Sequence, residues 1–80
     1  MDIKSLSPEQ CRAARALLNL DQNALAAAAA VSRGVIIDFE KGRRVTTRNN
    51  LAAIQRVLEE AGVEFTNGDA PGVRLRKKKR

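Results

Sequence analysis

The stretch that decides the fold is QNALAAAAAVSRGVIIDFEKG, residues 22–42. Each half of it follows a polar residue suited to cap a helix N-terminus, Asp21 before the first half and Ser32 within the second. The alanine run favours helix in the first half, and Gly42 supplies a stop for the second. The sequence therefore predicts two short helices, over about 22–29 and 33–41, joined by a tight turn.

The same signals recur on both sides of this stretch. Ser7, Pro8 and Gln10 form a capping box that opens a helix over about 8–18, and Thr47 opens a fourth helix that Gly62 ends. Apolar and polar residues then alternate in two short runs, which is typical of a β-hairpin. We expect a mainly α fold with the helices in residues 1–62, a hairpin over 63–76 and a basic, disordered tail over 77–80.

Composition argues against several classes of protein. The chain has one cysteine and no histidine, so we expect no disulfide within it, no metal and no cofactor. It offers no clustered nucleophile and base and no glycine-rich phosphate loop, which argues against an enzyme. No apolar run is long enough to span a bilayer and no signal peptide is evident, so we expect no membrane partner and a cytoplasmic location.

Charge and aromatic content point to a polyanionic partner. The net charge is +6, and the six basic residues Arg74, Arg76 and 77–80 equal that whole excess. The only aromatic residues are Phe39 and Phe65, so the stacking platforms of single-strand binders are missing. Double-stranded DNA is therefore the favoured nucleic acid. RNA binding is suggested only by the basic tail and ranks third, below DNA binding and the protein-interaction function considered below.

The pattern Gln22-x-x-Leu25-Ala26-x-x-x-Ala30-Val31-Ser32-x-x-x-Ile36-x-x-Phe39-Glu40-x-Gly42 closely resembles the Cro/repressor-like helix-turn-helix regulators, also called the xenobiotic-response-element family. The resemblance covers about residues 8–62. It implies a bacterial-type, four-helix, lambda-repressor-like domain that binds double-stranded DNA and regulates transcription, as a repressor or an activator, with the repressor favoured. Two departures stand out: Ala30 replaces the usual glycine of the turn, and a hairpin replaces the family's fifth helix. The family's mode of dimerisation therefore cannot be carried over.

By this resemblance, the second helix of the motif presents its N-terminal end to base edges. Arg33 has the fork that fits guanine O6 and N7, the alternative being a phosphate contact or a solvated side chain, and Gly34 lets the backbone come close. Val35 and Ile37 are expected to touch thymine methyl groups, unless one of them belongs to the core. Asp38 either accepts from cytosine N4 or orients a neighbouring arginine.

A second set of residues is expected at DNA phosphates, where charge, reach and helix N-termini suffice. These are Gln22, Asn23, Ser32, Lys41, Arg43, Arg44 and Arg48. Arg15 and Glu40 resemble the family's ion pair across the fold, which is an architectural role. Cys11 lies on the apolar face of its helix and is expected to be a buried hydrophobe rather than a redox sensor.

The hairpin presents an energetic problem, because two strands alone are marginal in water. One apolar face, made by Val63, Phe65, Val73 and Leu75, is suited to lie on the fourth helix. An open strand edge also invites the same strand of a second copy, which predicts a homodimer on a pseudo-palindromic operator. The competing function is a protein-interaction module on the same scaffold, such as an anti-activator or an antitoxin.

Overall fold

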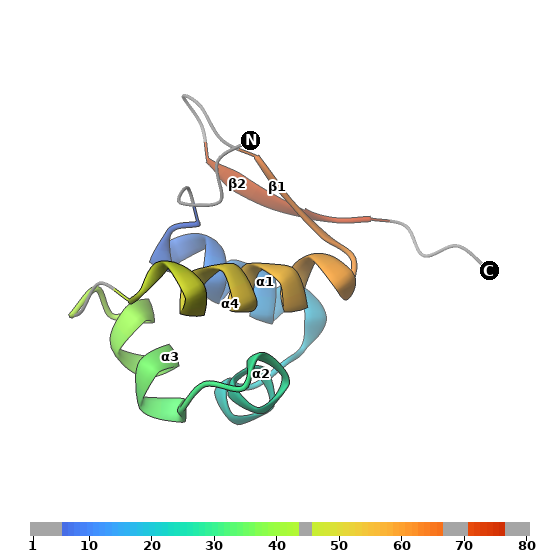
Figure 1. Ribbon diagram of the computed structural model, residues 1–80. Coiled ribbons are helices and arrows are strands. Elements are labelled where there is room, and N and C mark those ends of the chain that lie inside the picture. Colours follow the sequence, from blue (N-terminus) through green and yellow to red (C-terminus); the bar gives the residue numbers. More distant parts are fainter. Residues whose placement is uncertain (1–5, 44–45, 67–70, 77–80) are drawn as a thin grey trace.

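The computed structural model describes residues 6–43, 46–66 and 71–76. Its elements are α1 (Pro8–Leu18), α2 (Gln22–Ala29), α3 (Arg33–Glu40), α4 (Arg48–Glu60), β1 (Val63–Thr66) and β2 (Gly72–Leu75). Figure 1 shows α1 behind α4, with α2 and α3 below them and the hairpin above. The expected mainly α fold of four helices and a C-terminal hairpin is confirmed. Helix α3 ends one residue earlier than expected, with Lys41 as its C-cap, and α4 ends at its C-cap Ala61, directly before Gly62.

The helices begin where they do because a polar side chain caps each one. A side-chain oxygen of the residue before each helix accepts a hydrogen bond from the main-chain N–H three residues on. The four caps are Ser7, Asp21, Ser32 and Thr47. At α1 the predicted capping box is complete, because the Gln10 side chain also accepts from the main-chain N–H of Ser7 over 3.0 Å.

The core lies between α1, α4 and the pair α2–α3. Its largest fully buried side chains are Leu25, Ile36, Ile54, Leu58, Val63 and Cys11. Each buried Leu or Ile contributes about 1.5–3 kcal/mol relative to an exposed one, so this small cluster carries much of the domain's stability. In the described part of the chain, no helix is long and apolar enough to cross a membrane.

The hairpin rests on the helices of its own chain. Its strands pair antiparallel, with Val63 opposite Leu75 and Phe65 opposite Val73. The hairpin was expected to lie on α4, and β1 does contact that helix, but both strands also contact α1. The reason is Gln10 of α1, whose amide nitrogen donates to the main-chain oxygens of Thr66 and Gly72 over 2.9 and 3.0 Å.

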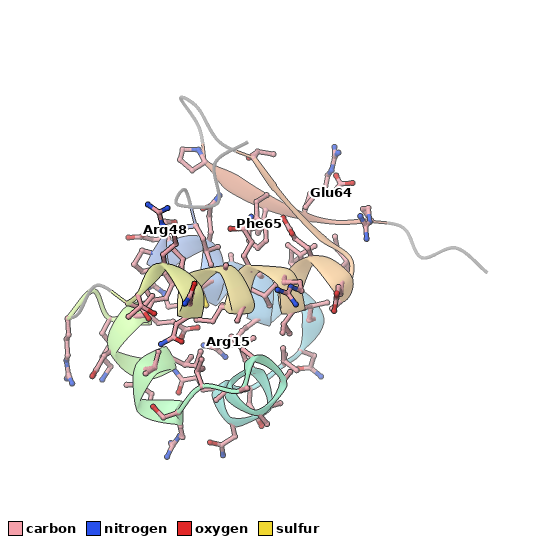
Figure 2. All side chains as sticks on the ribbon, viewed as in Figure 1. Arg15, Arg48, Glu64 and Phe65 are labelled. Carbon is pink, nitrogen blue, oxygen red and sulfur yellow. The ribbon has the colours of Figure 1, made fainter. Side chains whose placement is uncertain are left out.

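The two faces of the hairpin differ in their surroundings. Figure 2 shows Phe65 between the strands and the helices, while Glu64 lies on the outer face. Glu64 there accepts from Arg74 at 2.6 Å in an exposed ion pair. On the inner face Val63 is buried and Phe65 and Val73 are half-buried, whereas Leu75 is exposed. Of these four side chains, Leu75 is therefore the one that the helices leave exposed.

Candidate nucleic-acid interface

Helices α2 and α3 are joined by the short turn at residues 30–32. Ala30 ends α2 in the left-handed region, at φ 58° and ψ 42°, and its N–H is directed at the oxygens of Ala26 and Ala27. Val31 N–H closes the turn on Ala26 O over 3.0 Å, and Ser32 then caps α3. This geometry lets one helix brace a second helix that projects from the domain. Alanine at positive φ costs on the order of 1 kcal/mol more than glycine would, so the departure at this position stores strain.

Helix α3 divides its side chains between the core and the surface. Ile36, Phe39 and Glu40 are buried. Of the five residues expected to read bases, Arg33 and Gly34 are exposed, and Val35, Ile37 and Asp38 are partly exposed. Neither Val35 nor Ile37 belongs to the core cluster or packs against it, so the structure gives no support to the core alternative for either residue.

Gly34 has no structural requirement for glycine within this chain. A Cβ built on it would meet only Ser32 Oγ, at 3.9 Å, and its φ is not positive. A larger side chain would therefore fit the isolated domain. The surface around the first turn of α3 is left open for a close approach by another molecule.

Asp38 pairs with an arginine of the basic loop. Arg43 Nη1 lies 3.6 Å from Asp38 Oδ1, and Arg43 N–H donates to the main-chain oxygen of Asp38 over 2.9 Å. This contact corresponds to the second of the two roles considered for Asp38, the orientation of a neighbouring arginine. The carboxylate is partly exposed, so an approaching base amine can still reach it.

The residues expected at phosphates fall into two groups in space. Gln22, Asn23 and Ser32 lie at the N-terminal ends of α2 and α3, where free main-chain N–H groups favour anions. Lys41, Arg43 and Arg48 lie beyond the other end of α3 and are exposed. The division is not complete in space, because Gln22 bonds to Glu40 at the C-terminal end of α3 and lines a hollow together with Lys41 and Arg43. Ser32 is separated from that loop by the eight residues of α3, about 12 Å at 1.5 Å per residue.

Within the second group, Arg48 stands apart. Figure 2 shows it at the N-terminal end of α4, on the side of that helix away from α2. Arg44 and the tail 77–80 lie outside the described residues.

Beneath this surface, Glu40 is the hub that fixes the three N-terminal helices. It is 2% exposed, and Arg15 donates two hydrogen bonds of 2.7 Å to it, from Nε to Oε2 and from Nη2 to Oε1. Cys11 Sγ donates to Oε2 over 3.1 Å, and Gln22 Nε2 donates to Oε1 over 3.1 Å. The structure thus brings the expected pair Arg15 and Glu40 together, and it adds a partner from α2.

The electrostatics of the hub follow from these contacts. Burial by itself raises the pKa of Glu40, but the hydrogen bonds from Arg15, Cys11 and Gln22 outweigh it and hold the pKa below its ordinary value. The hydrogen bond to Glu40 raises the pKa of Arg15. Burial, followed by the neighbouring carboxylate of Glu40, raises the pKa of the Cys11 thiol. Glu40 is therefore a stable anion, and Cys11 stays a neutral thiol, as expected of a structural residue.

Two side chains behave differently from the sequence-based expectation. Gln22 was expected to serve phosphate alone, yet one of its amide hydrogens is used by Glu40, which leaves the other for an external acceptor. Arg12 was not singled out at all, yet its Nη1 donates to the main-chain oxygen of Glu40. Its position three residues before Arg15 places both on one side of α1, and this spacing was the available signal.

An open hollow of about 690 Å³ lies beside the hub. Its lining includes four cations, Arg12, Arg15, Lys41 and Arg43, against the two carboxylates of Glu9 and Glu40. The excess of positive charge suits a polyanion backbone more than an acidic partner.

Comparison with family models decides the family. The model described as Helix-turn-helix matches residues 12–65, which include α2, the turn and α3. The chain belongs to the helix-turn-helix family. The resemblance to Cro/repressor-like regulators is thereby confirmed, and the domain is a regulator that binds double-stranded DNA. A comparison with curated proteins returned no match.

Proposed function

We propose that this helix-turn-helix protein is a transcriptional repressor that acts as a homodimer on a pseudo-palindromic operator, with α3 in the major groove. The observation that carries the proposal is the division of α3. Its buried side chains are fixed by the core and by Arg15, while Arg33 and Gly34 are exposed at its N-terminal end and Val35 is partly exposed beside them. A recognition helix needs this combination, because base contacts require a rigidly held helix with an uncommitted outer face.

In this proposal Arg33 reads a guanine, Val35 and Ile37 contact thymine methyl groups, and Asp38 holds Arg43 toward the backbone. The N-terminal ends of α2 and α3 bind one stretch of phosphates through Gln22, Asn23 and Ser32. The loop after α3 and the start of α4 bind another, through Lys41, Arg43, Arg44 and Arg48. The hairpin of residues 63–76 supplies the contact between subunits.

The proposal is tested by selecting bound duplexes from a random library with the full-length protein. Binding by the Arg33→Ala variant is then compared on the selected site and on single-base variants of it. Loss of a bidentate contact is expected to cost about 1–3 kcal/mol on the selected site and to relax the preference at one position of each half-site.

The matched control is Arg56→Ala, which removes the same charge from an exposed position on α4, away from α3. Equal weakening of Arg33→Ala on every sequence would show that Arg33 touches only phosphate. Failure to enrich any duplex would favour the protein-interaction alternative.

A further inference from the structure

The exposed apolar surface of the domain is concentrated on one side of the hairpin. Within the part of the chain that the structure describes, the large hydrophobic side chains that remain exposed are Leu17 of α1 (42%) and Leu75 of β2 (45%). Leu75 faces Val63 across the hairpin, yet Val63 is only 1% exposed. Val73 of β2 packs against the core as Phe65 of β1 does, so the uncovered part of this apolar face is its Leu75 end.

Leu17 and Leu75 belong to a single ridge. Ala13 and Val73 line the same hollow between α1 and β2, and Gln10 ties the beginning of α1 to Gly72. Helix α1 and strand β2 are in contact and run in the same direction in Figure 1. One helical turn beyond Ala13 and two strand residues beyond Val73 both advance about 6 Å, so Leu17 and Leu75 follow side by side.

Among the described residues, no strand pairs with the edge of β2 that faces away from β1. Arg76 N–H donates to Gly62 O over 2.7 Å, and alternation along an antiparallel pair then directs the main-chain groups of Arg74 toward β1 as well. The main-chain N–H and C=O groups of Val73 and Leu75 consequently point away from β1, toward the open edge. Such an edge is a template for another strand.

We propose that β2, flanked by Leu17 of α1, is the surface on which a second copy of this chain pairs, by antiparallel addition of its own β2 about a two-fold axis at Arg74. This proposal rests on the dimer of the proposed function and specifies which strand edge makes it. The axis at Arg74 places Val73 opposite Leu75 of the second copy and Leu75 opposite its Val73. The short strand is thus complementary to itself in both main-chain hydrogen bonds and apolar contacts.

Charge favours the β2 edge over the β1 edge for a like partner. Ala13 and Leu17, the exposed α1 positions along the ridge, carry no charge, and Glu9 lies only at its beginning. Arg74 would face its counterpart, but each copy already holds Glu64 against it at 2.6 Å. The opposite side carries Glu59 and Glu60 at the end of α4 and Arg76, which donates to the main-chain oxygen of Glu59, so two copies meeting there would have to desolvate charged side chains.

The first test is the oligomeric state of the full chain without DNA, by sedimentation equilibrium. We expect a dimer, and Leu17→Glu should weaken it by at least about tenfold because it buries a charge in the interface. The matched control Ala16→Glu adds the same charge at the next exposed position of α1, on the side facing Arg15 and Asn19, and should leave the dimer intact. Circular dichroism melting of each variant verifies that it is folded.

A pair of cysteine variants identifies the edge independently of these mutations. Arg74→Cys and Glu64→Cys each break the same exposed ion pair, so their effects on folding are matched. With the axis at Arg74, the two Cα atoms at that position lie about 4.5 Å apart, within disulfide range. We therefore expect a reducible covalent dimer from Arg74→Cys under mild oxidation, and none from Glu64→Cys. Cys11 is fully buried and does not interfere.

A monomeric full-length protein, a dimer that survives Leu17→Glu, or crosslinking through Glu64→Cys instead of Arg74→Cys would each overturn the proposal. If the edge of β2 instead binds an extended peptide of another protein, the full-length protein should be monomeric and form no crosslink. The outcome is separable from that of DNA binding: a dimer with these properties that binds no duplex would refute the proposed function and leave this surface standing.

Discussion

Replacing Ala30 with glycine is expected to stabilise the domain, although glycine inside helices usually lowers stability. Ala30 ends α2 at φ 58° and is exposed, so removal of its methyl group uncovers no core. An L-residue in the left-handed region costs about 1–2 kcal/mol. The greater freedom of glycine in the unfolded chain returns about 0.4–1 kcal/mol of that, which leaves a net gain of about 0.8 kcal/mol.

Urea and thermal denaturation of Ala30→Gly, followed by circular dichroism, measure this gain. For a domain of this size, about 0.8 kcal/mol corresponds to a rise of roughly 3–6 °C in the melting temperature. The matched control is Ala28→Gly, two residues earlier, exposed and inside α2. There the same substitution is expected to cost about 1 kcal/mol, because the conformation is helical and alanine is the better helix former.

The decisive result is that the same substitution changes the free energy of unfolding with opposite signs at positions 28 and 30. Asn19, the other non-glycine residue at positive φ in the described chain, provides a third point, because asparagine tolerates that region better than alanine does. Asn19→Gly should therefore gain less than Ala30→Gly. If Ala30→Gly lowered stability as Ala28→Gly does, the assigned backbone conformation and its strain would be wrong.

Three further predictions concern the hub and the hairpin. Arg15→Ala should lower the free energy of unfolding by about 3 kcal/mol, because it leaves buried Glu40 without its main partner. Changing both residues to alanine should recover part of that loss, and additive losses in a double-mutant cycle would contradict the coupling. Folding lowers the pKa of Glu40, so the contribution of this carboxylate to stability is complete above about pH 4.5, its ordinary pKa, and is lost as pH falls through the folded pKa. Glu40→Gln should therefore lose less stability in acid than the unchanged protein does, as measured by urea titration across that pH range. Gln10→Ala should speed amide exchange in residues 72–76 more than in α3, since Gln10 ties both strands to α1, whereas uniform acceleration would show a general loss of stability instead.

Most of the fold could be predicted from the sequence because its signals are local. The caps Ser7, Asp21, Ser32 and Thr47 each act within four residues, so they mark helix starts without knowledge of the rest of the chain. The outward residues of α3 followed from the same boundaries together with the family resemblance. What remained undetermined depends on distant parts of the chain.

Gln10 illustrates this limit. Its role in the capping box was predicted, but its amide nitrogen serves strands more than fifty residues away. Gln22 and Arg12 reach Glu40 for the same reason, through the packing of α1 and α2 against α3. The exposure of Leu75 was equally unpredictable from the sequence. Strand alternation assigns Leu75 to the same apolar face as Val63, and only the placement of the helices distinguishes the two.

The arrangement of α3 separates the affinity of this protein for DNA from its stability. The buried residues Ile36, Phe39 and Glu40 hold the helix in place, while Arg33 and Gly34 on its exposed face make no contact on which the core depends. Substitutions on the exposed face therefore act on binding alone, usually within about ±0.5 kcal/mol in stability, whereas substitutions at the hub shift the helix and affect every base contact together. A change in sequence preference at constant melting temperature is accordingly the signature of a residue that reads DNA, and a joint loss of both is the signature of one that positions the helix.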